Sequence, residues 1–412
     1  MAAVARGRRN YAGRPDYWIL ALAIILTGIG LLAVYSASFA IGYSDFHNVN
    51  YFITKQSISA VAGIALLLIF QRVPYDYLRR YSPLIMLFSL VSLLIVLLPH
   101  FGVRSNGANR WIAIGPLPPL EPSEFAKLAM VIYISAWLAA KGDHVKQFSL
   151  GVVPFVMMVG LVGGLILLEP DFGTAIVITL TTMTMFFVAG AALPHVLTLL
   201  LSGVAGAGLM ISVEGYQSAR LTSFLSPEKD PAGTGFHILQ LLIALGSGGI
   251  HGLGLGASRQ KFFYVPGAHT DGIFAIIGEE MGLIGGLVVI FLFAGLVYRG
   301  FRAGVKSPDK FAFLLAVGIT CWIGYQAVIN IGGITRSIPM SGIPLPLVSY
   351  GGSALIATLA AIGVLLNVSR HLGEAGVMER ERSGGAVPGG RRVRSEPRNR
   401  SRKRRLIGRG RK

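Results

Sequence analysis

Three acidic side chains stand at the start of one apolar segment, in VPGAHTDGIFAIIGEEMG (residues 265–282). Ionised carboxylates are costly inside a bilayer, so acids at membrane depth indicate function by default. Asp271 would lie at a helix N-terminus, where a carboxylate is favoured and reached by water. Glu279 and Glu280 would lie deeper, and we expect Glu280 mainly to make structural bonds. His269 could act as an acid or base, but a lone histidine is more often structural.

A second cluster of charges recurs every three residues in NRWIAIGPLPPLEPSEFAKLAM (109–130). Pro122 suits a first helical turn. Glu124 and Lys127 would then share one helix face, about 60° apart. A local pair that neutralises both charges explains these two residues, but it leaves Glu121 without a role.

The sequence lacks the motifs of several enzyme classes. The sequence contains no HExxH, no GxSxG, no Walker lysine and no Cys/His set with metal-ligand spacing, which argues against zincins, serine hydrolases and ATP-driven pumps. Its one cysteine, Cys321, excludes an intrachain disulfide. No dedicated metal cage or resident cofactor is predicted, and a divalent cation, Mg²⁺ or Mn²⁺, is left open.

The elements that must position these charges are membrane helices. The chain is 53% hydrophobic and 14% charged, with a mean hydropathy of +0.63, which is typical of a polytopic helical membrane protein. Runs long enough to span, about 20 residues each, divide the chain as follows: 17–40, 51–70, 77–98, 121–140, 149–169, 171–190, 193–213, 271–298, 310–331 and 350–370. We therefore predict an all-α fold with about ten transmembrane helices over residues 17–370.

Basic residues alternate between the predicted loops and set the topology. The N-terminus (1–16) and the second, fourth and eighth loops are basic, whereas 41–50 and the 169–171 turn carry no basic residue. The positive-inside rule then places both termini in the cytoplasm. The basic tail (371–412) has a disordered composition, and we expect it to contact anionic lipid rather than nucleic acid.

The longest predicted loop, 214–270, lies between the seventh and eighth helices on the outer face. It includes FHILQLLIAL (236–245), which is too short to span and favours an interfacial or re-entrant helix. The glycine-rich GSGGIHGLGLG (246–256) is weak evidence for phosphate binding, and a flexible turn explains it equally well.

Several ordered motifs together resemble the SEDS family of cell-wall polymerases (FtsW, RodA and SpoVE). They are NGANRWIAIGPLPPLEPSEFAKL (106–128), EPDFGTA (169–175), RLTSFLSPEKDPAGTGFHILQ (220–240), IALGSGGIHGLGLGASRQKFFYVPGAHTDGIFAIIGEEMGLIG (243–285) and SGIPLPLVSYGGSALI (341–356). The ASRQKFFYVP stretch is more similar to FtsW and SpoVE than to RodA.

The resemblance implies an inverting peptidoglycan glycosyltransferase that polymerises lipid II at the outer face of the bacterial cytoplasmic membrane. It also implies a class B penicillin-binding protein as transpeptidase partner, other divisome proteins and a role at the division septum. The family's essential aspartate falls on Asp271 and its helix-four lysine on Lys127. The family pattern has Glu where Gly267 stands and Phe where Gly272 stands.

The implied chemistry needs one base and cations, because the undecaprenyl pyrophosphate leaves as a stable anion and requires no protonation. We predict Asp271 as that base. The outer-face cations available to the pyrophosphate are Lys127, Arg104, Arg110, Arg220, Arg259 and Lys261. Supporting residues within the motifs are Trp111, Glu121, Glu124, His269, Thr270, Glu279, Glu280 and Ser349. We also expect Lys127 to pair with Asp271 in the resting enzyme.

Alternative functions remain open at this point. Ten helices with buried charges also fit a lipid II flippase, and an elongation or sporulation paralogue would share the motifs. A non-catalytic scaffold that activates a transpeptidase is a third class, but it leaves the outer-face acid and cations unexplained.

Overall fold

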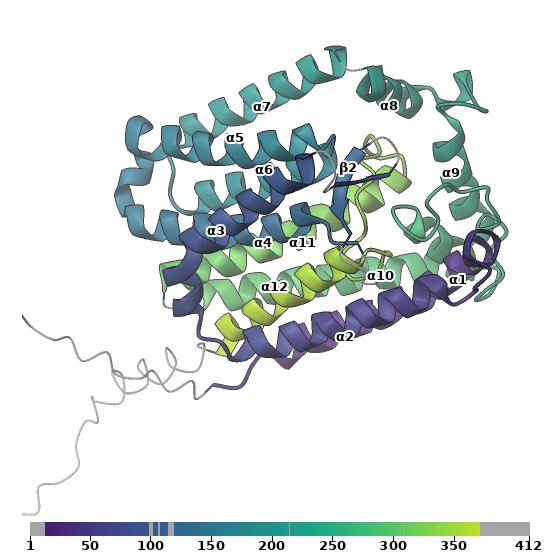
Figure 1. Ribbon diagram of the computed structural model, residues 1–412, viewed down its shortest axis with the longest axis horizontal. Coiled ribbons are helices and arrows are strands. Elements are labelled where there is room, and N and C mark those ends of the chain that lie inside the picture. Colours follow the sequence, from purple (N-terminus) through teal and green to yellow (C-terminus); the bar gives the residue numbers. More distant parts are fainter. Residues whose placement is uncertain are drawn as a thin grey trace, which may run out of the picture. The chain divides into compact units, whose positions relative to one another are not determined.

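The computed structural model describes residues 13–98, 102–105, 108–113, 119–213, 215–307 and 309–370 (Figure 1). Within these ranges the side chains at 103–105, 108–109, 207, 209–213, 215–217 and 219 lie outside the description. Most of the basic N-terminus and the whole of 371–412 also lie outside it, so the predicted boundaries of these segments stay predictions.

The predicted all-α architecture is confirmed, because every predicted apolar run coincides with a helix. In chain order these helices are α1 (Tyr17–Phe46), α2 (Tyr51–Arg72), α3 (Tyr75–Leu97), α4 (Pro122–Lys141), α5 (Val153–Leu168), α6 (Phe172–Val188), α7 (Leu193–Val213), α10 (Ile273–Val305), α11 (Lys310–Ile334) and α12 (Gly352–Arg370). A π-helical turn, Phe148–Val152, leads into α5.

Eight of the helices in the described residues are long and apolar enough to cross a membrane. Helix α6 has 17 residues and the apolar part of α7 spans Leu193–Gly206, so both are shorter than these eight. The chain is therefore a multi-pass membrane protein, whereas the number of ten spans stays a prediction.

Three helices form the centre of the bundle. In the most apolar windows of α12, α11 and α4, 89%, 78% and 67% of the residues are buried, against 28% in α3. Helix α12 packs along α2, and α11 lies between α10, α6 and α4. The central helices carry the polar side chains of the bundle interior, while the outer helices present apolar side chains outward.

One end of the bundle carries the irregular elements, which the sequence predicted only in part. Strands β1 (Gly102–Ser105) and β2 (Ala108–Ile112) form an antiparallel hairpin in the loop before α4. Helices α8 (Gly215–Leu225) and α9 (Phe236–Gly248) follow α7 at this end (Figure 1). Helix α9 confirms that the apolar stretch in the long loop is helical; its interfacial position stays a prediction.

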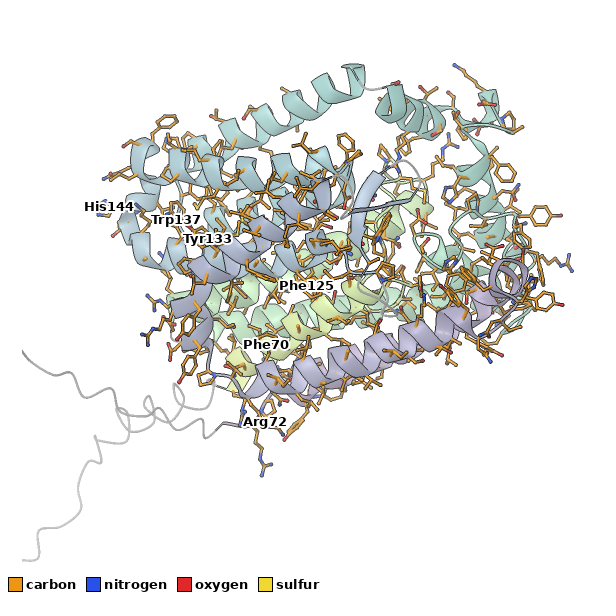
Figure 2. All side chains as sticks on the ribbon, viewed as in Figure 1. Phe70, Arg72, Phe125, Tyr133, Trp137 and His144 are labelled. Carbon is orange, nitrogen blue, oxygen red and sulfur yellow. The ribbon has the colours of Figure 1, made fainter. Side chains whose placement is uncertain are left out.

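The other end carries the basic loops, where Arg72 and His144 are labelled in Figure 2. Asp16 caps α1 by accepting a hydrogen bond from the Trp18 amide, and it also pairs with Arg299 on α10, whose Nε lies 2.9 Å away. Asn367 on α12 donates from Nδ2 to the carbonyls of Gln71 and Val73 at 2.9 and 2.8 Å. These bonds link α1 to α10 and α12 to α2.

Candidate active site

A cleft of about 730 Å³ opens at the end of the bundle that carries β2 and α9. Its walls come from β2, the start of α4, the α5–α6 turn, α8, α9, the turn before α10 and the loop before α12. Among the residues predicted from sequence, those that line it are Arg110, Trp111, Glu121, Glu124, Arg220, Thr270 and Asp271. Charged side chains far apart in the sequence therefore meet in one cavity.

Asp271 is held by a tight turn that ends at the first residues of α10. The amides of Thr270 and Gly272 donate to the Gly267 carbonyl at 2.9 and 3.0 Å. Gly267 has φ +64°, a left-handed conformation that favours glycine. The Thr270 hydroxyl lies 3.0 Å from Asp271 Oδ1. The carboxylate is half-buried and faces the cleft.

Arg220 brings a cation from α8 to the same part of the cleft. Its Nη1 donates to the Ser341 carbonyl at 3.0 Å, which fixes the guanidinium against the loop before α12. Arg220 Nη2 and Asp271 Oδ2 lie 3.2 and 3.7 Å from the point that a Cβ at Gly342 would occupy. The predicted base and a predicted phosphate ligand therefore face the same space.

His237 is a cleft residue that the sequence analysis missed. It lies on α9 and makes a hydrogen bond with the Pro266 backbone, next to the Asp271 turn. Burial lowers the pKa of His237; the Asp271 carboxylate opposes this shift and the Arg220 guanidinium adds to it. The only sequence signal was an ionisable residue in a short, mostly apolar helix.

The opposite wall of the cleft is acidic around one arginine. Arg110 donates from Nε to the Glu169 carbonyl at 2.8 Å and also binds the Pro170 carbonyl. Burial, followed by the charges of Glu124 and Asp171, raises the pKa of Glu121 to about 8, while Lys127 and Arg110 oppose the shift. Glu121 is therefore largely protonated near neutral pH.

Two further acids lie at the turn between α5 and α6. Asp171 caps α6 by accepting a hydrogen bond from the Thr174 amide at 3.1 Å. Burial, then the Asp171 and Glu121 charges, raise the pKa of Glu169 to about 9 against the influence of Arg110. Both acids belong to the EPDFGTA motif, but neither was predicted as a site residue from the sequence.

The predicted pairing of Lys127 with Asp271 is wrong for this structure. Lys127 Nζ lies 2.8 Å from Glu124 Oε1 and 2.8 Å from Gln326 Oε1, and its side chain is 2% exposed. The local Glu124–Lys127 pair expected from the three-residue spacing is present. A lysine two turns into α4 is thus held in the bundle interior, so it cannot reach the mouth of the cleft without breaking these bonds.

The prediction that Lys261 is a phosphate ligand is also wrong for this structure. It is fully buried, with Nζ 3.0 Å from Glu280 Oε1, 3.2 Å from Ser36 Oγ and 2.6 Å from the Gly256 carbonyl. Glu280 accepts a hydrogen bond from the Ser36 hydroxyl at 2.6 Å, a partly buried bond of the structural kind expected for it. Glu279 accepts from the Arg259 amide at 2.9 Å and from the Ser258 hydroxyl. The acids therefore bind the long loop to α10.

The remaining predicted residues lie away from the cleft lining or outside the description. The Arg104 side chain lies outside the described residues, and the exposed Arg259 does not line the cleft. The ring centroids of His269 and Phe52 lie 4.5 Å apart, and burial lowers the pKa of His269 to about 4. Ser349 accepts from the Leu345 amide at 2.8 Å, which shapes the loop before α12.

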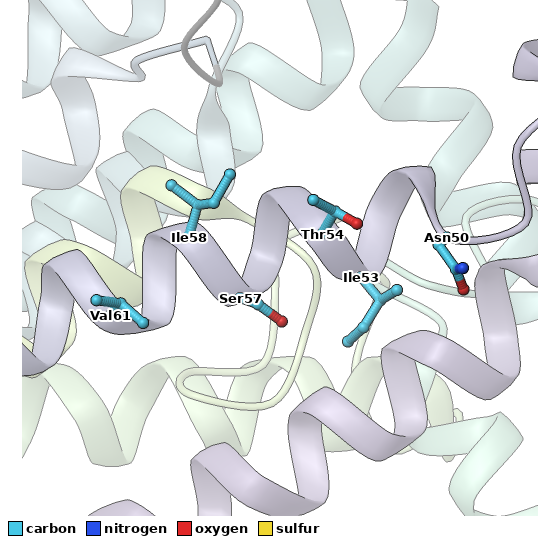
Figure 3. Close-up of a pocket in the computed structure, with 6 residues that line it drawn as sticks. All are labelled: Asn50, Ile53, Thr54, Ser57, Ile58 and Val61. Atoms are coloured by element: carbon cyan, nitrogen blue, oxygen red, sulfur yellow. The ribbon is translucent and has the colours of Figure 1, made fainter.

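Neither metal ligands nor a second chemical site are evident elsewhere in the described chain. No group of three or more His, Cys, Asp or Glu side chains in the described residues could hold a metal ion. A second hollow, of about 520 Å³, is lined by residues of α2 and its N-cap, from Asn50 to Val61 (Figure 3). It contains no ionisable side chain, so the cleft at Asp271 is the better candidate.

Comparisons with known proteins give a consistent result. The family model FTSW_RODA_SPOVE, described as "Cell cycle protein", matches residues 17–374. Stage V sporulation protein E of Bacillus subtilis is 42% identical over 358 residues, covering 87% of this chain and 97% of the relative. A probable peptidoglycan glycosyltransferase FtsW of Geobacter metallireducens is 39% identical over 359 residues, covering 87% and 96%.

Solved structures share the fold as well. A chain from the study "Structural coordination of polymerization and crosslinking by a peptidoglycan synthase complex" superposes with a TM-score of 0.71 at 26% identity, covering 87% of this chain and 98% of that one. The rod shape determining protein RodA of Thermus thermophilus superposes with a TM-score of 0.62 at 26% identity, covering 86% and 97%.

Proposed function

The chain belongs to the FtsW/RodA/SpoVE family of cell cycle proteins, and from this premise we propose that it is a peptidoglycan glycosyltransferase that polymerises lipid II. Relatives that it matches over most of its length are named probable peptidoglycan glycosyltransferases. The observation that carries the proposal is the cleft in which Asp271, Arg220 and Arg110 line one cavity.

The reaction joins a sugar hydroxyl to an activated anomeric carbon. The 4-hydroxyl of the acceptor attacks the donor carbon, its proton passes to the Asp271 carboxylate, and the bond from that carbon to the pyrophosphate oxygen breaks. Attack opposite the leaving group inverts the anomeric configuration. A general base contributes about 10²–10⁴-fold to such a step.

The leaving group explains why one carboxylate is sufficient. Glycosidases need a second carboxyl group as acid, because a sugar alkoxide must be protonated as it leaves. A lipid pyrophosphate is already a stable anion, so cations that bind it replace the acid. Arg220 and Arg110 line the cleft, and they are the phosphate ligands we propose. Neither Lys127 nor Lys261 is proposed for this role, because both are buried in ion pairs.

Glu121 gives the acidic wall a distinct property. A carboxyl group that stays protonated near neutral pH adds no negative charge to a cavity that must bind pyrophosphate. It can instead donate a hydrogen bond. The raised pKa of Glu121 thus reduces the electrostatic cost of placing acids beside the substrate anion.

A partner and a location complete the proposal. A class B penicillin-binding protein would supply the crosslinking activity. A solved chain with this fold comes from a study of a peptidoglycan synthase complex that coordinates polymerization and crosslinking, which supports such a partner. We place the enzyme in the cytoplasmic membrane at the division septum, with both termini inside. Reporter fusions after residues 48, 145, 230 and 305 should read out, in, out and in, and an outside signal at 145 or 305 would contradict this topology.

The deciding experiment uses the purified protein, alone and with its transpeptidase partner, on labelled lipid II. We expect glycan chains that a muramidase digests. A parallel vesicle assay measures translocation of lipid II, so a flippase would move the substrate without joining it. Absence of glycan with the partner present would overturn the proposal. Repeating the reaction after EDTA treatment tests the divalent cation, since an unchanged rate would exclude a requirement for it.

A further inference from the structure

One side chain joins the two backbone segments that flank the catalytic carboxylate. Asn330, on α11, donates from Nδ2 to the carbonyl of Asp271 at 3.0 Å and to the carbonyl of Ile343 at 2.8 Å. Both carbonyl oxygens can only accept hydrogen bonds, so the side-chain amide must present its NH2 group to them. Asn330 is 4% exposed, and water cannot readily replace either bond.

A second amide stands one helical turn earlier on the same face of α11. Gln326 donates from Nε2 to the Pro344 carbonyl at 2.9 Å. Its Oε1 accepts from Lys127 Nζ and from Trp322 Nε1, each at 2.8 Å. Residues four apart lie on one helix face, so Gln326 and Asn330 together form what we call the α11 clasp.

The α11 clasp holds backbone that has little regular structure of its own. Residues 339–345 form neither helix nor strand, and Asp271 lies in a turn before α10. Both segments line the cleft, and the Ser341 carbonyl also binds Arg220. The position of the Asp271 backbone relative to the arginine site therefore depends on Asn330, which bonds to both segments.

The clasp also replaces the direct contact expected from sequence between Lys127 and Asp271. Lys127 donates to Oε1 of Gln326, and Nε2 of Gln326 donates to the Pro344 carbonyl. The residue before Pro344 is Ile343, and its carbonyl and the Asp271 carbonyl both accept from Asn330. The lysine thus connects to the catalytic turn through side-chain amides and backbone. Its buried charge orients Gln326 by fixing which end of that amide faces α4.

We propose that Gln326 and Asn330 are positioning residues, which set the placement of the Asp271 carboxylate against the phosphate-binding arginines. This inference rests on the proposed function. A displacement of about 1 Å from productive geometry can cost on the order of 10²-fold in rate. Loss of the clasp should therefore lower kcat far more than it changes the KM for lipid II, because neither Gln326 nor Asn330 lines the cleft.

The chain offers a matched control in Asn367. This residue is also a buried asparagine that bridges two carbonyls, those of Gln71 and Val73. It lies fifteen residues after Gly352 on α12, about 22 Å from the cleft end at 1.5 Å per residue. Asn330→Leu and Asn367→Leu should lower the Tm by similar amounts, because each removes a buried amide that donates to two backbone carbonyls.

Polymerisation kinetics then separate positioning from stability. We expect Asn330→Leu to lose at least about 10-fold in kcat with KM within about 3-fold, and Asn367→Leu to keep its kcat. Asn330→Asp keeps the volume but offers at most one donor, so it should fall between wild type and Asn330→Leu. A kcat within 3-fold of wild type for Asn330→Leu, or an equal loss in Asn367→Leu, would overturn the inference.

Hydrogen exchange provides a readout that does not depend on activity. Peptides covering 266–273 and 341–346 should exchange faster in Asn330→Leu than in wild type and remain unchanged in Asn367→Leu. Unchanged exchange in both variants would overturn the clasp. If wild type itself makes no glycan, the proposed function fails, while this exchange measurement still decides whether Asn330 holds the catalytic turn.

Discussion

Two carboxylate environments lie within ten residues of each other at the start of α10, and their difference is instructive. Asp271 is half-buried, faces a large cleft and bonds to a neighbouring hydroxyl. Glu280 is 4% exposed and meets Lys261 and Ser36 deep in the protein. Glu280 Oε1 accepts from internal partners and Glu280 does not line the cleft, whereas the Asp271 carboxylate lines it and is open to a substrate there.

The Glu279–Glu280 region has a structural purpose that the Asp271 region lacks. Helix α10 is broken at Gly282, and the loop 249–254 pairs with the break: the Leu253 amide donates to the Glu279 carbonyl at 3.0 Å, and the Leu283 amide donates to the Gly249 carbonyl at 2.9 Å. Backbone groups freed within a membrane helix need such partners. The side chains of the two acids bond to residues 258–261, which follow that loop, so their charge stabilises architecture rather than chemistry.

The largest contrast should come from neutralising one acid in each region. Asp271→Asn keeps the side-chain volume but removes the base, and we expect glycan synthesis to fall by at least about 100-fold with little change in Tm. Glu279→Gln should lower the Tm, because the Ser258 hydroxyl and the Arg259 amide lose a charged acceptor. Thermal unfolding and lipid II assays on both variants test this. Near-normal polymerisation by Asp271→Asn would remove it from the mechanism.

The buried ion pair should be expensive to break on one side only. Lys261→Met leaves Glu280 charged and buried, and removing one member of a buried pair costs about 3–5 kcal/mol. Adding Glu280→Gln should recover part of that loss, because no unpaired charge remains. Chemical or thermal unfolding of the two single variants and the double variant measures the coupling. Additive losses would show that the pair contributes nothing as a pair.

Replacing a glycine by alanine in each region tests how tightly the backbone packs there: Gly267 lies beside Asp271, and the Gly256 carbonyl accepts from Lys261, the partner of Glu280. At Gly267 a Cβ would lie 2.4 Å from Asp271 Oδ1, whereas at Gly256, with φ +80°, it would meet no heavy atom within 4 Å. Both alanine variants carry a backbone strain of about 1–2 kcal/mol. Only Gly267→Ala should also lose activity, by about 10-fold, through displacement of the carboxylate. Equal activity in the two variants would mean that Asp271 tolerates the shift.

The smallest expected effect concerns Glu121, the acid of the opposite wall. Its pKa rises from 4.5 to about 8 in the folded protein, so the folded state holds a proton that the unfolded state releases. This contribution to stability is present below pH 4.5 and is lost as the pH rises towards 8. Tm measured from pH 5 to pH 9 should fall less steeply for Glu121→Gln than for wild type, and parallel curves would contradict the raised pKa.

Local patterns in the sequence were sufficient for the architecture and for part of the site. Apolar runs of about 20 residues located the helices, because lipid demands continuous apolar segments. The three-residue spacing predicted the Glu124–Lys127 pair, because side chains three residues apart on a helix lie next to each other whatever the tertiary structure. The position of Asp271 before an apolar helix indicated an accessible acid, and the motifs indicated the family.

Longer-range partners could not be obtained in this way. Gln326 lies 199 residues after Lys127, and Asn330 lies 59 residues after Asp271. A sequence read for periodicity shows which face a residue occupies but not which helix packs against that face. Lys261 has the composition of a surface cation, and only the packing of the long loop onto α1 and α10 buries it.

The sequence by itself therefore determined the class of protein, the helices and Asp271 as the candidate base, because these follow from local chemistry, hydropathy and motifs. Only the tertiary structure decided which acids and cations are open to substrate. Arg220 and His237 join Asp271 in the cleft through the folding of the loop after α7, while Lys127 and Lys261 are taken out of it by buried partners. The physical reason is that the availability of a charge depends on its desolvation and its partners, and both are properties of the packed bundle.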